Sequence, residues 1–167
     1  MDYSRYLILF SGGADSTYFV EKEPTATHLI FYAGSKIQKT QIAQANATRF
    51  GRWLTVDVSP RKIGTDGEIN QIHALYDTEM ALAASITAAS FGMLGIVMCF
   101  NKNDIGIDTD SIKKIMQRAA PEFDLALPLI NTEAAQIRSE LKAKNIPYVS
   151  CMIAENCGKC PKCLRGY

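Results

Sequence analysis

The sequence predicts an α/β protein with a Rossmann-like parallel sheet of about five strands and helices on both faces. Short apolar runs alternate with stretches of helical periodicity from residue 6 to residue 144. A glycine-rich turn directly follows the first apolar run, where open parallel sheets bind their ligands. The 167 residues are enough to bury a core within about one domain without help from disulfides or metal.

The strands are predicted from apolar runs that are rich in β-branched and aromatic residues. Four such runs have strand length, and a fifth, shorter run predicts a brief last strand. The predicted strands are residues 6–10, 28–32, 53–58, 96–100 and 125–127.

Helical periodicity fills most of the sequence between these runs. Asp110 is predicted either as the N-cap of one helix or as a catalytic carboxylate, and both alternatives stay open here. Residues 59–72 contain two glycines and a proline and are predicted to be a long loop, which is more often functional or mobile than idle. The predicted helices are one opened by the glycine turn, residues 38–50, residues 78–91, one beginning at Asp110, and residues 131–144.

Composition and charge narrow the function classes. Hydrophobic residues make up 47% and charged residues 21%, as in ordinary globular proteins. Lysine and arginine number 18 against 17 acidic residues, a net charge of +1. This excludes a general polyanion-binding surface and argues against nucleic acid as a partner. No targeting segment or bilayer-spanning run is visible, so we expect a cytoplasmic protein that uses no membrane.

Residues 11–17 read Ser-Gly-Gly-Ala-Asp-Ser-Thr and lie between the first strand and a helix. The glycines let the backbone approach an anion, the first-turn N–H groups point at it, and the hydroxyls add donors. The lysine of P-loop kinases and the GxGxxG of dinucleotide-binding proteins are both missing. A plain strand-to-helix turn capped by Ser11 or Asp15 is the alternative. The string resembles the signature of PP-loop ATP pyrophosphatases, which cleave ATP between the α and β phosphates.

Four of the five cysteines fall within the last seventeen residues, at Cys151, Cys157, Cys160 and Cys163. Four thiolates suit tetrahedral zinc, and two-residue spacers let a tight turn aim two sulfurs at one ion. We therefore predict a closed, structural zinc site in a tail of residues 150–167, packed on a nucleotide-binding domain of residues 1–149. A disulfide framework and an iron–sulfur cluster are the alternatives.

Three further residues have chemistry that a site could use. Cys99 is expected to be a buried core residue inside the fourth strand, and His28 to be structural at the start of the second. His73 lies in or beside the long loop and is the one histidine placed for acid/base chemistry, with an ordinary polar surface as the alternative.

The glycine loop near the N-terminus and a CxxCxxC tail with one cysteine upstream together resemble the 7-cyano-7-deazaguanine synthase (QueC) family. Asn101, Asp104 and Asp110 resemble the family's Asn…Asp…Asp stretch after the fourth strand. The resemblance implies the adenine nucleotide alpha-hydrolase-like PP-loop fold, with Asp15, Asp104 and Asp110 as catalytic residues and Asp15 organising the loop or its Mg²⁺. The residues implied to bind ATP are Phe10, Ser11, Gly12, Gly13, Ala14, Asp15, Ser16, Thr17 and Asn101.

Members of this family activate 7-carboxy-7-deazaguanine with ATP, form an amide with ammonia and dehydrate it to the nitrile preQ0. The resemblance implies an AMP-forming carbon–nitrogen ligase of queuosine-type biosynthesis. Its implied cofactors are one structural Zn²⁺ and Mg²⁺ accompanying ATP, and its implied partners are ATP, ammonia and a deazaguanine-like carboxylate. The resemblance also suggests a homodimer.

The chain departs from the family pattern at residues 33–36, at residues 74–79 and at Ala134, and it is shorter than typical members. Two alternatives follow from these departures. One is a divergent QueC-like enzyme that adenylates another carboxylate, on a modified nucleobase or a protein group, in a phage or defence context. The other is a degenerate ATP-binding module that holds a partner.

Overall fold

The computed structural model describes residues 1–33, 37–58, 69–104, 108–150 and 158, with the backbone alone at residues 37, 38 and 69–76. Five strands form one sheet, β1 (Tyr6–Leu9), β2 (His28–Tyr32), β3 (Trp53–Asp57), β4 (Gly95–Val97) and β5 (Asp124–Ala126). Every neighbouring pair is parallel, and the spatial order is β3-β2-β1-β4-β5. The order therefore reverses between β1 and β4, at the centre of the sheet.

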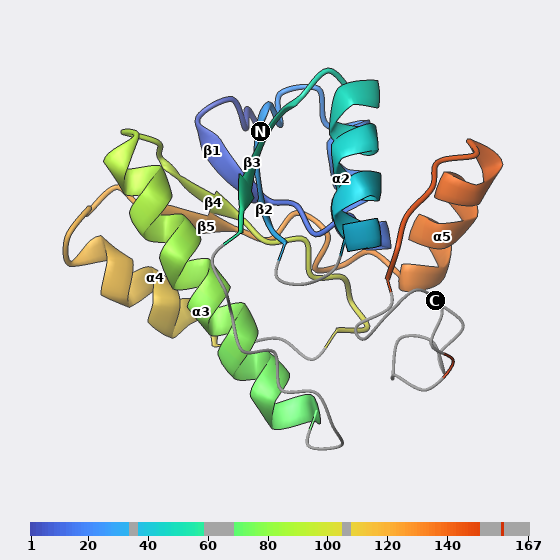
Figure 1. The fold of residues 1–167 in the computed structure, drawn as a ribbon. Helices are drawn as coiled ribbons and strands as arrows, with labels where there is room; N and C mark the ends of the chain where they lie inside the picture. The colour runs from blue at the N-terminus through green and yellow to red at the C-terminus, as the bar shows by residue number, and fades with distance from the viewer. Residues whose placement is uncertain (34–36, 59–68, 105–107, 151–157, 159–167) are drawn as a thin grey trace.

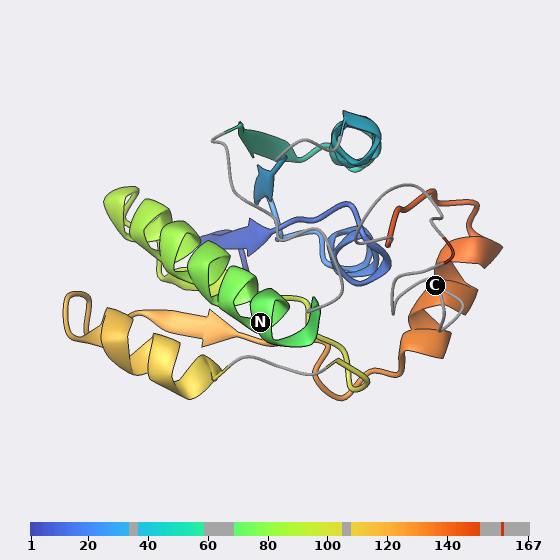
Figure 2. The same ribbon diagram turned by 60° about the horizontal axis from the view of Figure 1, so that its bottom comes forward.

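Among the described residues, five helices cover the two faces of this sheet (Figures 1 and 2). On one face lie α1 (Ala14–Lys22), α2 (Ile37–Arg49) and α5 (Ala134–Ala143), and on the other lie α3 (Ile69–Ser90) and α4 (Thr109–Gln117). The predicted α/β architecture with a five-stranded parallel sheet is confirmed. None of the helices in the described part of the chain has both the length and the apolar character needed to cross a membrane.

Two apolar cores hold the layers together, one on each face. Side chains alternate along a strand, so Ile8 of β1 enters the core beneath α1 and α5 while its neighbour Leu7 enters the core beneath α3 and α4. Ile137 and Leu141 of α5 join the first core, and alanines of α3 line the second.

Glycine at position 95 is required by the pairing of β4 with β5. A Cβ atom at Gly95 would lie 1.9 Å from the carbonyl oxygen of Asp124, which no side chain can tolerate. The register places Gly95 directly opposite Asp124 on the neighbouring strand. Its absence of a side chain lets the short edge strand come close to the rest of the sheet.

The predicted strands are confirmed to within about three residues at their ends, while two helices differ. The third helix begins at Ile69, so residues 69–72, predicted as loop, are helical; residues 59–68 lie outside the described part. The last helix begins at Ala134 and not at residue 131, because the Thr132 N–H closes a turn on the Leu129 carbonyl.

Candidate functional site

The candidate site lies where the sheet order reverses. The loop after β1 and the loop after β4 leave the carboxyl ends of adjacent parallel strands, and parallel sheets bind ligands at such reversal points. Residues 10–17 come from the first loop and the start of α1, and residues 101–104 come from the second. The topology thus brings together two segments that lie far apart in the sequence.

The phosphate loop is here defined as residues 11–13 with the first turn of α1. Gly12 allows this loop to pack closely against α2. Its φ angle is 66°, in the left-handed region that favours glycine. A Cβ atom there would lie 3.2 Å from the Cβ of Ala43 on α2. Gly13 is the N-cap of α1, and, being a glycine, it provides no side chain to cap the helix.

Hydroxyl oxygens accept the hydrogen bonds of three loop amides. The Ser11 N–H donates to Ser16 Oγ (3.1 Å), the Gly13 N–H to Ser11 Oγ (3.2 Å) and the Ala14 N–H to Ser150 Oγ (3.1 Å). A hydroxyl can act as donor or acceptor, so these partners can rotate to donate when an anion takes over the amides. The amides of the loop can therefore exchange their hydrogen bonds to these hydroxyls for hydrogen bonds to a phosphate group.

Asp15 is held from the opposite loop by Asn101. The Asn101 Nδ2 group donates to Asp15 Oδ1 across 2.9 Å, and both side chains are buried. Asn101 is fully buried, and its side-chain amide binds Asp15. It therefore supports the phosphate loop from the interior of the protein. The arrangement fixes the orientation of a carboxylate within the first turn of a helix.

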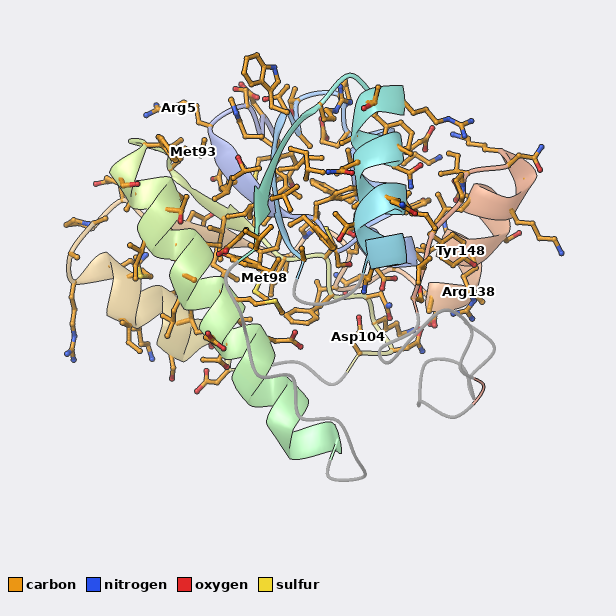
Figure 3. The ribbon with its side chains drawn as sticks, viewed as in Figure 1. Arg5, Met93, Met98, Asp104, Arg138 and Tyr148 are labelled. Carbon is orange, nitrogen blue, oxygen red and sulfur yellow. The ribbon has the colours of Figure 1, made fainter. Side chains whose placement is uncertain are left out.

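The loop after β4 is itself organised around Asn101. The Asn101 N–H donates to Asp104 Oδ2 (3.0 Å), and the Asn103 N–H donates to Asn101 Oδ1 (2.8 Å). Asn103 Oδ1 in turn accepts from the N–H of Ala134, the first residue of α5 (2.9 Å). Asp15 and Asp104 therefore bind different nitrogen atoms of one residue, and the partly exposed Asp104 lies in the loop after β4 (Figure 3).

Asp110 lies apart from this network. It is an exposed residue in the first turn of α4, and the N-cap of that helix is Asp108. The Asp108 carboxylate accepts from the Ser111 N–H (3.0 Å) and from its hydroxyl (2.6 Å), which lowers the Asp108 pKa below its ordinary value. The alternative in which Asp110 caps the helix is wrong, because the N-cap is Asp108, two residues earlier.

The remaining predicted ATP-binding side chains are mostly internal. Phe10 and Thr17 are fully buried, and Ala14 and Ser16 are also buried, whereas Ser11 is exposed. The Phe10 N–H donates to the Ile30 carbonyl and so extends the β1–β2 pairing by one bond. These residues build the loop, which would contact a ligand chiefly through its backbone and hydroxyls.

Cys99 packs against the core, as predicted, but it lies beyond the strand and not inside it. It lies two residues beyond β4 and is partly exposed. Burial of its thiol raises the Cys99 pKa well above the ordinary value, and the nearby Asp15 carboxylate raises it further. The thiol therefore stays protonated and is a poor nucleophile.

Residues 147–150, here called the strap, join the C-terminal segment to the phosphate loop. The Asn46 Nδ2 group of α2 donates to the Pro147 carbonyl (2.7 Å), and the Val149 N–H donates to the Gly12 carbonyl (2.9 Å). Ser150 completes the contact through Ala14. Sequence reasoning gave no role to Asn46, Asn103 or Ser150; the only signal was the presence of polar residues beside two recognised motifs.

A hollow of about 910 Å³ lies between α5 and the strap, lined in part by Arg138, Lys142 and Tyr148. Figure 3 labels Arg138 and Tyr148 on these two segments. No residue of the phosphate loop lines the hollow, so it is separate from the site described above.

Several predicted residues lie outside the described part of the chain, among them Cys151, Cys157, Cys160 and Cys163. Within the described part, no three His, Cys, Asp or Glu side chains form a group that could hold a metal. The zinc site thus stays a prediction. His73 lies within α3, in the part of that helix described by its backbone alone. His28 is the first residue of β2, as expected.

Comparisons with known proteins give information on the fold and not on the function. No family model matches the chain, and no curated protein matches it in sequence. Among solved structures, the chain is similar to that of a predicted tRNA methyltransferase subunit from Methanocaldococcus jannaschii. The TM-score is 0.52 and the identity 15%, over 83% of this chain and 75% of that one. The similarity supports the Rossmann-like α/β fold.

Proposed function

We propose that this protein is an ATP-dependent, AMP-forming enzyme of the PP-loop type that adenylates a small carboxylate and transfers it to ammonia. The observation that carries the proposal is the clamp between Asp15 in the phosphate loop and Asn101 in the loop after β4, at the reversal point of the sheet. The sequence of residues 10–17 and the cysteine spacing favour a QueC-like enzyme with 7-carboxy-7-deazaguanine as the substrate.

The proposed chemistry solves a specific problem. A carboxylate resists attack by ammonia until one of its oxygens becomes part of a good leaving group. Its oxygen attacks the α-phosphorus of ATP, and pyrophosphate departs with the β and γ phosphates. Ammonia then attacks the acyl carbon and AMP leaves, which gives an amide. A second ATP would activate the amide oxygen in the same way, so that it departs with AMP and the nitrile is formed.

The residues of the loop suit the first of these steps. The amides of Gly13 and Ala14 lie at the N-terminus of α1, where the helix dipole favours negative charge. They would bind the departing pyrophosphate, whose charge grows as the α–β bond breaks, so they would stabilise the transition state more than bound ATP.

Asp15 and Asp104 fit a magnesium ion carried by ATP. Magnesium usually binds through one or two carboxylates together with substrate phosphates, and it neutralises phosphate charge when bound. Asn101 keeps these two carboxylates in one network by hydrogen bonds to both. The three residues together would orient the phosphates relative to the loop amides.

One assay tests the proposal. The protein is incubated with ATP, Mg²⁺, ammonium and 7-carboxy-7-deazaguanine, and AMP and the nitrile are followed by mass spectrometry with Asp15→Asn as the control. Nitrile formation that fails in the control supports the QueC-like function. AMP formed only with another carboxylate indicates a divergent enzyme. ATP binding without AMP indicates a binding module, and absence of ATP binding refutes the enzymatic proposals.

A further inference from the structure

Three hydrogen bonds fix the strap to α2 and to the phosphate loop. Asn46 holds its first residue, Val149 binds the loop backbone at Gly12, and Ser150 binds the first residue of α1. The contacts of Val149 and Ser150 therefore act on Gly12 and Ala14, two nearby residues of the phosphate loop. Ser150 is buried, so solvent competes weakly for its hydroxyl.

The bond from Val149 sets the direction of the Gly12 carbonyl. Glycine peptides reorient easily because no Cβ restricts them, and a reversed Gly12 peptide would turn its carbonyl oxygen on an incoming phosphate. The Val149 N–H holds that oxygen on the strap side at 2.9 Å. This bond favours the backbone orientation that an anion requires.

The Ser150 hydroxyl performs a related task at Ala14. In the loop without nucleotide, it accepts from the Ala14 N–H at 3.1 Å and holds the first amide of α1 in place. When a phosphate takes over that amide, the same hydroxyl can rotate and donate to the phosphate. A Cβ atom on Gly13 would lie 3.9 Å from Ser150 Oγ and 3.8 Å from the Val149 carbonyl, so the strap lies directly against the N-cap. The loop therefore has one wall made by the C-terminal part of the chain.

We propose that Ser150 is a nucleotide-binding residue, whose hydroxyl holds the Ala14 amide in the free loop and donates to the phosphate in the occupied one. With Val149 it makes ATP affinity depend on the position of the strap. This inference rests on the proposed function, because it concerns the phosphate loop as an ATP site. Since coupling between two events is reciprocal, ATP also protects the strap from opening.

The test compares Ser150→Ala with Ser150→Thr in the full chain. Ser139→Ala is the control, because Ser139 is exposed on α5 and belongs neither to the phosphate loop nor to the strap. Binding of Mg²⁺·ATP is measured by calorimetry, and amide hydrogen exchange of residues 11–17 is measured without nucleotide. Ser150→Ala should weaken ATP binding roughly three- to tenfold, the usual effect of losing one hydrogen bond. It should speed exchange in residues 11–17 while exchange in β1 and β4 stays unchanged.

The outcomes separate this inference from the proposed function. Restoration of affinity and slow exchange by Ser150→Thr, with Ser139→Ala at the wild-type level, supports the role of the hydroxyl. Wild-type ATP affinity in Ser150→Ala overturns the inference and leaves the function intact, and so does equal loss in Ala and Thr variants. If the wild-type protein binds no ATP, the proposed function fails; unchanged exchange in Ser150→Ala would then overturn the inference as well.

Discussion

The amide of Asn101 and the carboxylate of Asp15 lie 2.9 Å apart, although 86 positions separate them in the chain. This hydrogen bond joins the loops that follow two adjacent central strands. At the point where the strand order reverses, it holds polar groups of the two loops in a defined arrangement.

Replacing Asn101 should damage both stability and nucleotide binding. Asn101→Ala removes the hydrogen bonds that the Asn101 side chain makes to the buried Asp15 carboxylate and to the Asn103 N–H, a loss we expect to cost about 1–3 kcal/mol of unfolding free energy. Asn131→Ala, at an exposed asparagine, is the control. Urea unfolding and ATP calorimetry check both effects; equal stability of the two variants would contradict the clamp.

Gly12 and Gly51 offer a matched pair for the phosphate loop. Both have a φ angle near +65°, but a Cβ at Gly12 would meet α2, whereas one at Gly51 has nothing within 4 Å. Alanine at either site should cost about 1–2 kcal/mol from the left-handed backbone, and Gly12→Ala more because of the contact with Ala43. Only Gly12→Ala should reduce ATP affinity. Similar affinities in the two variants would show that the loop does not bind ATP.

The carboxylates of Asp108 and Asp110 should differ in what they contribute to α4. Asp108→Ala removes the N-cap and should lower the melting temperature, whereas Asp110→Ala should leave it nearly unchanged. Thermal melts followed by circular dichroism measure the difference. The AMP-forming assay on Asp110→Ala then examines the catalytic role separately, because a loss of turnover without a loss of stability would assign it to the reaction.

Acid should loosen the contact between α1 and α5. The pKa of Glu140 is lowered from 4.5 to about 2, chiefly by the Lys22 ammonium at 2.6 Å and further by Gln136 and Tyr18. A lowered pKa in the folded state means that this stabilisation is complete above pH 4.5 and is lost as the pH falls toward 2. The difference in melting temperature between wild type and Glu140→Gln should shrink across that interval. A difference independent of pH would refute the prediction.

Metal analysis should find about one zinc per chain if the four tail cysteines bind as predicted. Cys157→Ser should lose the metal, while Cys99→Ser should keep it, since Cys99 is not one of the four predicted ligands. Mass spectrometry of the purified protein after buffer exchange gives the ratio. Iron in place of zinc, or no metal, contradicts the zinc assignment.

The strands and the phosphate loop could be predicted because their signals are local. An apolar run followed by two glycines specifies a strand and a turn whatever the rest of the chain does. The N-cap of α4 was misplaced by two residues because Asp108 and Asp110 are both acceptable caps, and only the hydrogen bonds to Ser111 distinguish them.

The polar network could not be predicted because its partners meet only in three dimensions. Nothing near Ser150 in the sequence identifies Ala14 as its partner, and nothing near Asn103 indicates that it binds the first amide of α5. Such contacts depend on the sheet order, which places distant loops side by side. The motif residues were recognisable, whereas the residues that hold them in place were not.

The contact between Ser150 and Ala14 has a consequence for the order of events during synthesis. In the direction of synthesis, Ser150 follows Ala14 by 136 positions. A nascent chain therefore carries the phosphate loop without this hydrogen-bonding partner while those residues are added. The signature of the loop is made before the residue that completes it, so a chain terminated between the two would lack a finished anion cradle even though it contains every residue of the signature.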